Sequence, residues 1–250
     1  MQSVRHRIAN LSVAVGLFVL SASPAVAAFI NLTPQGSDTS SVNSVPLSQL
    51  VSGGNSEGIS VGDKNFDNFS YFSTVDMPIA ANVNVIGIID GDGNYGLRFQ
   101  GGFKDLFDPG NESSDSLIGF DVSVADPRTH LISDVHLFGN PALSADGSLN
   151  AFAEVVETIS GAFGNAQLRI QNDLNGLINA AWIDPLPSPV STLHVVKDIQ
   201  LFSTDGVRAT ISFVDQTFSQ TVIPEPSSMA LLGIAVAAMG WIGSRGRRVV

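Results

Sequence analysis

The chain has 250 residues, a formal net charge of −11 and no cysteine. Five of its twelve basic residues lie in the two terminal segments, which leaves a body with seven basic and twenty-two acidic residues. Such a body is repelled by phosphate backbones, so nucleic acid is not an expected partner, and the lack of cysteine excludes disulfides and thiolate chemistry.

The first 28 residues have the three parts of an export signal in the required order. A charged start is followed by an apolar run, 11–20, and then by small residues at Ala25, Ala27 and Ala28. The apolar run is shorter than the roughly 20 residues that a permanent membrane span needs. We therefore expect residues 1–28 to form a signal helix that is removed, leaving a mature chain that starts near Phe29.

The body alternates apolar and polar residues, as β-strands with one buried face do. We expect the segment 29–56, which is rich in Ser and Gly from residue 35 onward, to be loose, and the domain proper to span 57–222. Within it, two clear alternations predict the inward-facing sets Ile118, Phe120, Val122, Val124 and Val207, Ala209, Ile211, Phe213.

Further short strands are expected throughout the body, with Gly-, Asn-, Asp- and Pro-rich turns such as Asn175-Gly176 between them. The predicted strands are 59–61, 66–72, 83–89, 95–99, 132–138, 149–156, 166–170, 177–183, 193–196 and 199–202. This spacing favours an all-β fold, a single antiparallel β-sandwich, for which a jelly roll is one arrangement that fits.

One turn offers oxygen ligands to a metal ion. Asp90, Asp92 and Asn94 alternate along a loop, but Tyr95 and Gly101 occupy the positions where an EF-hand needs Gly and Glu. Calcium bound by this acidic loop is one hypothesis, and ordinary Asp-Gly turn chemistry is the other. No other cofactor is expected, because the body contains neither zinc-ligand spacing nor a complete catalytic motif.

The C-terminal segment 223–250 has a second ordered set of signals. Pro224, Glu225 and Pro226 precede an apolar stretch, 227–244, that is followed by Arg245, Arg247 and Arg248. As a transmembrane helix this stretch covers roughly 27 Å, slightly less than a bilayer core. The arginines would keep its end in the cytoplasm and place the body in the periplasm.

This arrangement resembles the PEP-CTERM sorting domain. The resemblance implies export in a Gram-negative bacterium, transient anchoring in the inner membrane, and recognition of Pro224, Glu225 and Pro226 by exosortase. It further implies delivery to the cell surface or the medium, and a role in the exopolysaccharide or biofilm layer.

Two functions are compatible with this context. The favoured one is a non-enzymatic adhesive, structural or carbohydrate-binding protein, in which Tyr71, Tyr95 and Trp182 are the candidates for stacking on sugar rings. The alternative is an exported polysaccharide hydrolase, which would need two carboxylates in one cleft roughly 5 to 9.5 Å apart.

Overall fold

The computed structural model describes residues 30–32, 44–51, 58–74, 76–106, 113–144, 150–204 and 206–223, with residues 231, 233–235 and 239 of the C-terminal segment. Its elements are β1 (Ile30–Leu32), β2 (Ser44–Pro46), α1 (Leu47–Val51), β3 (Gly58–Val61), β4 (Lys64–Ser73), the 3-10 helix η1 (Ala80–Asn82), β5 (Asn84–Ile89), β6 (Tyr95–Lys104), β7 (Ser114–Val124), β8 (His130–Gly139), β9 (Ala142–Leu143), β10 (Phe152–Gly161), β11 (Gly164–Asp173), β12 (Gly176–Ile178), β13 (Ala180–Ile183), β14 (Thr192–Phe202) and β15 (Ala209–Val222).

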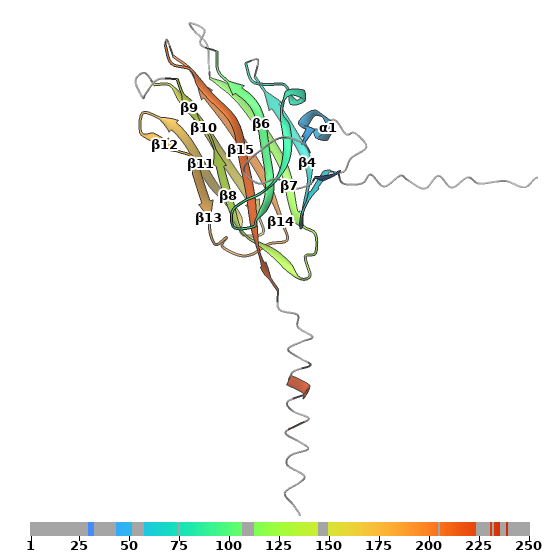
Figure 1. Ribbon diagram of the computed structural model, residues 1–250. Coiled ribbons are helices and arrows are strands. Elements are labelled where there is room, and N and C mark those ends of the chain that lie inside the picture. The colour runs from blue at the N-terminus through green and yellow to red at the C-terminus, as the bar shows by residue number, and fades with distance from the viewer. Residues whose placement is uncertain are drawn as a thin grey trace, which may run out of the picture.

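The described strands form two sheets that pack face to face (Figure 1). The first, sheet A, has the order β1-β3-β4-β7-β14-β10-β11-β12, and the second, sheet B, has the order β13-β8-β15-β6-β5-β2, with β9 beside β15. The chain passes from one sheet to the other repeatedly, for example between β13, β14 and β15. The predicted two-sheet, mainly β architecture is therefore confirmed.

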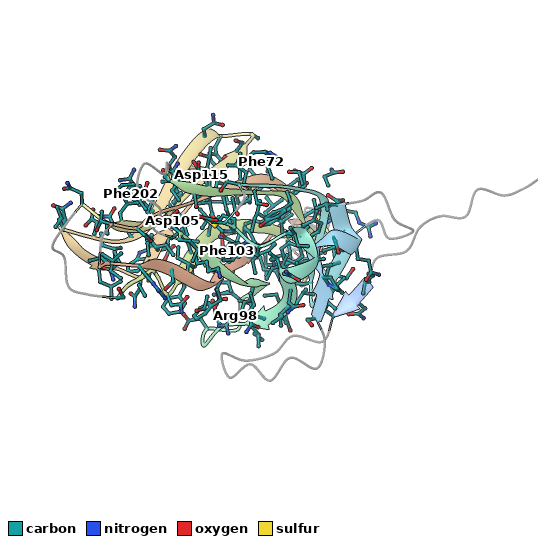
Figure 2. The ribbon with its side chains drawn as sticks, turned by 90° about the horizontal axis from the view of Figure 1, so that it is seen from above. Phe72, Arg98, Phe103, Asp105, Asp115 and Phe202 are labelled. Carbon is teal, nitrogen blue, oxygen red and sulfur yellow. The ribbon has the colours of Figure 1, made fainter. Side chains whose placement is uncertain are left out.

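Alternating side chains explain why these strands pair into a sandwich. Ile118, Phe120, Val122 and Val124 of β7 all point inward and are buried, as the sequence predicted. They join one hydrophobic core with residues of sheet B such as Phe103. Seen from above, Phe103 lies between the layers, Arg98 lies on the side of sheet B, and Phe72 and Asp115 lie on the side of sheet A (Figure 2).

The N-terminal part of the sandwich corrects the predicted domain boundary. Residues 29–56 were expected to be loose, but β1 pairs with β3, β2 pairs with β5, and Leu32, Val45 and Leu47 are buried in the core. The β1–β3 pairing is parallel, so the sandwich is not purely antiparallel. Short apolar stretches within a polar segment are enough to add two edge strands, because each needs to bury only one face.

A bulge in β15 corrects a second prediction. Ala209 and Ile211 face the core as expected, but the register against β6 shifts between Ile211 and Phe213. The extra residue brings Val214 to the core and turns Phe213 to the outer face of sheet B, because strand side chains alternate between faces.

The two predicted terminal helices fall largely outside the described residues. The expected signal helix lies wholly outside them, and of the predicted anchor, 227–244, only residues 231, 233–235 and 239 are described, all helical. No helix within the described residues combines the length and the apolar character that crossing a membrane requires.

Candidate functional site

A pocket of about 490 Å³ opens on the outer face of sheet B. Five strands or their connecting loops line it, namely β5, β6, β8, β13 and β15. Its volume lies within the range of roughly 300 to 1,000 Å³ that is usual for small-ligand sites. We call it the sheet B groove, and it is defined by Asp90, Asp92, Arg98, His136, Phe138, Trp182, Asp184, Asp215 and Thr217.

Strand register explains how residues far apart in the sequence meet in the groove. Asp215 of β15 lies opposite Arg98 of β6 on one side and opposite Phe138 of β8 on the other. In the next row, two residues further along these strands, His136 of β8 lies between Thr217 of β15 and Trp182 of β13. Directly opposite residues of antiparallel strands share a face, so these side chains form two adjacent rows.

Arg98 and Asp215 form the rigid centre of the groove. Arg98 donates from Nε to Oδ1 of Asp215 at 2.6 Å and from Nη2 to Oδ2 at 2.7 Å. The guanidinium carbon also lies 4.1 Å from the centroid of the Phe213 ring, a cation–π contact made possible by the bulge. Burial raises the pKa of Asp215, although the hydrogen bonds and charge of Arg98 work against it.

Two aromatic side chains extend the groove toward its β13 edge. Trp182 is 65% exposed and Phe138 is 41% exposed, which is unusual for large apolar side chains on a sheet. Phe138 is held by ring contact with Phe213 at a centroid distance of 5.9 Å. Exposed aromatic faces beside hydrogen-bonding groups suit a flat ligand that is apolar on one face and hydroxylated at its edge.

The predicted calcium loop forms the acidic rim of the groove. Oδ1 of Asp90 accepts from the backbone N–H of Asp92 at 3.0 Å and of Asn94 at 2.9 Å. Oδ2 accepts from the Asn94 amide at 3.0 Å and from the Thr217 hydroxyl at 2.9 Å. Burial alone would raise the pKa of Asp90, but these hydrogen bonds outweigh it and hold the pKa below its ordinary value.

This geometry is that of an Asp-initiated turn, because the carboxylate is engaged by donors of its own loop. Within the described residues, no group of three or more His, Cys, Asp or Glu side chains lies close enough together to hold a metal ion. Asn94 is not among these ligand types, so calcium binding by Asp90, Asp92 and Asn94 stays a prediction.

The three aromatic residues predicted to contact sugar lie in different places. Trp182 lines the groove, whereas Tyr71 of β4 belongs to sheet A and donates its hydroxyl to the Pro78 carbonyl oxygen. Tyr95, at the start of β6, is partly buried against the core, with its ring over Gly62. Of this set, only Trp182 is brought together with Asp90 and Asp92.

Sequence reasoning missed Arg98, His136, Phe138 and Asp215. These residues occupy the outward positions of strands, where polar and apolar side chains both occur freely, so no local pattern singles them out. His136 is flanked by two carboxylates, with Nδ1 3.9 Å from Oδ2 of Asp90 and Nε2 3.4 Å from Oδ1 of Asp134. Only the pairing order of β6, β15, β8 and β13 reveals the cluster.

Comparison with solved structures finds similar chains of low identity. TmCBM61 in complex with beta-1,4-galactotriose shares 9% sequence identity at a TM-score of 0.29, over 61% of this chain and 89% of the other. The apo form of BiXyn10A CBM1 shares 14% identity at a TM-score of 0.23, over 60% of this chain and 90% of the other. No curated protein matches the sequence.

The C-terminal segment has a more specific match. Residues 222–248 match the family described as the PEP-CTERM protein-sorting motif. The matched residues include Pro224-Glu225-Pro226, the apolar stretch that follows and the arginine cluster, so the predicted resemblance is confirmed. This protein therefore carries a PEP-CTERM protein-sorting motif at its C-terminal end.

Proposed function

We propose that this protein is exported, processed by exosortase through its PEP-CTERM tail, and binds carbohydrate of the extracellular layer through the sheet B groove without catalysing a reaction. The sorting motif and the signal-like segment 1–28 support export. The arginines after the apolar stretch support a periplasmic body during transit, and the sorting motif supports later release to the surface or the medium.

The observation that carries the proposed binding function is the pairing of exposed aromatic rings with fixed polar groups in one groove. Trp182 and Phe138 offer apolar faces on which the C–H face of a sugar ring can stack. The Arg98–Asp215 pair stands beside Phe138 and is held in place by two hydrogen bonds, so it can contact hydroxyl groups without first being ordered.

A carbohydrate ligand also fits the charges of the groove. Asp90, Asp92 and Asp184 line its rim, and the one arginine in its lining is already neutralised by Asp215. An anionic polymer would meet repulsion there, because its charges would find no free cation within the groove. We therefore favour neutral sugars, or sugars with amino groups, over uronic acids and sulfated sugars.

The hydrolase alternative requires a carboxylic acid that can deliver a proton to a glycosidic oxygen. Asp215 is the carboxylate in the groove with a raised pKa, but both of its oxygens accept hydrogen bonds from Arg98. Both oxygens of Asp90 are likewise engaged by its own loop and by Thr217. This engagement favours a binding role over catalysis.

Binding of the purified protein to exopolysaccharide from the producing cells tests the proposal. We expect Trp182→Ala and Phe138→Ala each to weaken binding by roughly two- to twelvefold, since a lost aromatic contact costs about 0.5 to 1.5 kcal/mol. Phe72→Ala is the matched control, because Phe72 is 60% exposed on the opposite sheet and should bind as the unaltered protein does.

Two outcomes would overturn the proposal. Unchanged binding by both groove variants would remove the groove from the binding site. A steady release of new reducing ends from the polysaccharide, abolished by Asp215→Asn, would replace the binding protein with the hydrolase.

A further inference from the structure

Three polar side chains meet inside the sandwich core. Lys197, Glu157 and Gln216 each have no exposed surface. They come from three strands, β14 and β10 of sheet A and β15 of sheet B, so the cluster spans the space between the two sheets (Figure 1). The cluster lies on the inner side of sheet B, behind the groove, and its side chains are not among those that line the groove.

Each of the three takes an inward position that its strand otherwise fills with apolar residues. Lys197 falls between Val195 and Ile199 in the buried series of β14, and Glu157 lies directly opposite Lys197 in the β10–β14 register. Gln216 takes the equivalent inward position in β15. Such placement is costly for ions, because a charged group loses its hydration on entering the core.

The contacts bring an amine, an amide and a carboxyl group together. Lys197 Nζ contacts both Oε2 of Glu157 and Oε1 of Gln216. The amide nitrogen of Gln216 donates to the carbonyl oxygen of His136 at 3.0 Å, which fixes the amide plane. Among the described residues, Oε1 of Glu157 has no hydrogen-bond partner although it is buried.

The surroundings favour the uncharged forms of both ionisable groups. Burial lowers the pKa of Lys197, and burial raises the pKa of Glu157, while their mutual attraction opposes both changes. Transfer of one proton from the amine to the carboxylate turns the ion pair into a nucleophilic amine beside a neutral carboxylic acid.

We propose that Lys197 and Gln216 form an intramolecular isopeptide bond with Glu157 as the proton shuttle. The lone pair of neutral Nζ attacks Cδ of Gln216, and the Glu157 acid group hydrogen-bonds the oxygen on which charge develops. As the intermediate collapses, the bond between Cδ and Nε2 breaks and a proton from Nζ passes through Glu157 to the departing nitrogen. One C–N bond forms, one breaks, ammonia leaves, and no oxidant or reductant is needed.

The bond would supply a covalent link between the two sheets, which a chain without cysteine otherwise lacks. The chain contains no cysteine, so disulfides cannot join its two sheets. An amide between β14 and β15 would join sheet A to sheet B covalently and would restrict the unfolded chain as a disulfide does. It would also leave a neutral amide beside a neutral acid, so that no charge needs to be buried in the core.

A second cluster provides an internal control. Lys64 Nζ donates to Asp63 at 2.6 Å and to Gln220, again on β15, at 3.2 Å. Here the carboxylate partner is 34% exposed, whereas Glu157 is fully buried. Burial lowers the pKa of Lys64 too, although its hydrogen bond to Asp63 opposes the change. The difference lies in the carboxyl group, because Asp63 is open to water and is less suited than the buried Glu157 to pass a proton within the core. We expect no bond between Lys64 and Gln220.

Mass spectrometry of the full chain purified under native conditions tests the proposal. The intact mass should be lower by one ammonia than the mass calculated from the sequence between the termini that the purified chain actually has. Trypsin should fail to cleave after Lys197, and fragmentation should yield one branched peptide that contains Lys197 and Gln216. Glu157→Gln and Lys197→Met should each restore the full sequence mass, and cleavage after Lys64 should be normal in every variant.

Several results would overturn the proposal, and none depends on whether the variants fold. A full sequence mass for the unaltered chain, with normal cleavage after Lys197, shows that the cluster is only an ion pair. Loss of water in place of ammonia puts the bond on Glu157 and contradicts the assigned roles. A loss of ammonia located at an asparagine, with no branched peptide, also contradicts the proposed bond.

Discussion

Among single residues, Asp90 has the clearest role in stability, because its carboxylate holds the loop between β5 and β6 and ties it to Thr217 of β15. Its pKa in the folded chain is held below the ordinary value of 3.8. A depressed folded pKa means that the ionised group stabilises the folded state above the unfolded pKa. This contribution disappears as the pH falls through the folded value.

We therefore expect Asp90→Ala to lower the free energy of unfolding by roughly 1 kcal/mol at neutral pH, and this difference should shrink as the pH falls below 3.8. Urea denaturation across a pH series measures it, with Asp92→Ala, an exposed neighbour, as the control. A difference that grows toward acid pH would contradict the assigned role. Thermal melting with and without calcium tests the metal hypothesis separately. A turn that binds no metal should give the same melting temperature in both conditions.

Residue type alone predicted some of the aromatic positions and not others. Trp182 could be selected from the sequence because tryptophan is rare in this body and suits sugar faces. Tyr71 and Tyr95 were selected by the same argument but pack against the fold, since residue type alone does not reveal which side of a strand faces solvent. Phe213 was expected in the core, and only the bulge explains its place beside Arg98.

At the level of elements, the sequence predicted which segments form strands better than where each strand begins and ends. The stretch 193–202 was expected to hold two strands, 193–196 and 199–202, but it lies within the single strand β14. A lysine within a run of apolar residues normally marks the point where a buried strand ends. Here Glu157 lies opposite Lys197, and Gln216 contacts it from the other sheet, so the strand continues through the core.

The N-terminal elements lead to a prediction about stability. Leu47 begins α1 and is fully buried, although it lies in the segment expected to be loose. Leu47→Ala should lower the free energy of unfolding by about 2 to 5 kcal/mol, the usual cost of a cavity in a core. Gln49→Ala, exposed on the same helix, should change it by less than about 0.5 kcal/mol in the same denaturation assay. Equal, small effects would place this helix outside the cooperative fold.

For the whole molecule, we expect the two ends to determine where the body is delivered. Replacing Pro224, Glu225 and Pro226 by alanine leaves the apolar stretch and the arginine cluster intact, so the precursor should still insert with its body in the periplasm. It should then accumulate uncleaved in the inner membrane. Fractionation and immunoblotting of the producing cells measure this, and release as efficient as that of the unaltered chain would contradict exosortase processing.

The C-terminal segment was the part of the molecule that sequence alone described best. Its signals are linear and depend on the order of charged, apolar and special residues, as the match at residues 222–248 confirms. The groove could not be predicted in this way, because Arg98, Phe138, Trp182 and Asp215 become neighbours only through strand order and register.

Fluorescence tests most directly whether the sheet B groove binds sugar. The chain has two tryptophans, Trp182 in the groove and Trp241 in the tail, so a chain that ends at Pro226 reports on Trp182 alone. Titration with neutral oligosaccharides cut from the producing cells' exopolysaccharide should change its emission in a saturable way, and Phe138→Ala should shift the midpoint by roughly two- to twelvefold. Emission that stays constant while the same oligosaccharides bind would contradict sugar binding in the groove.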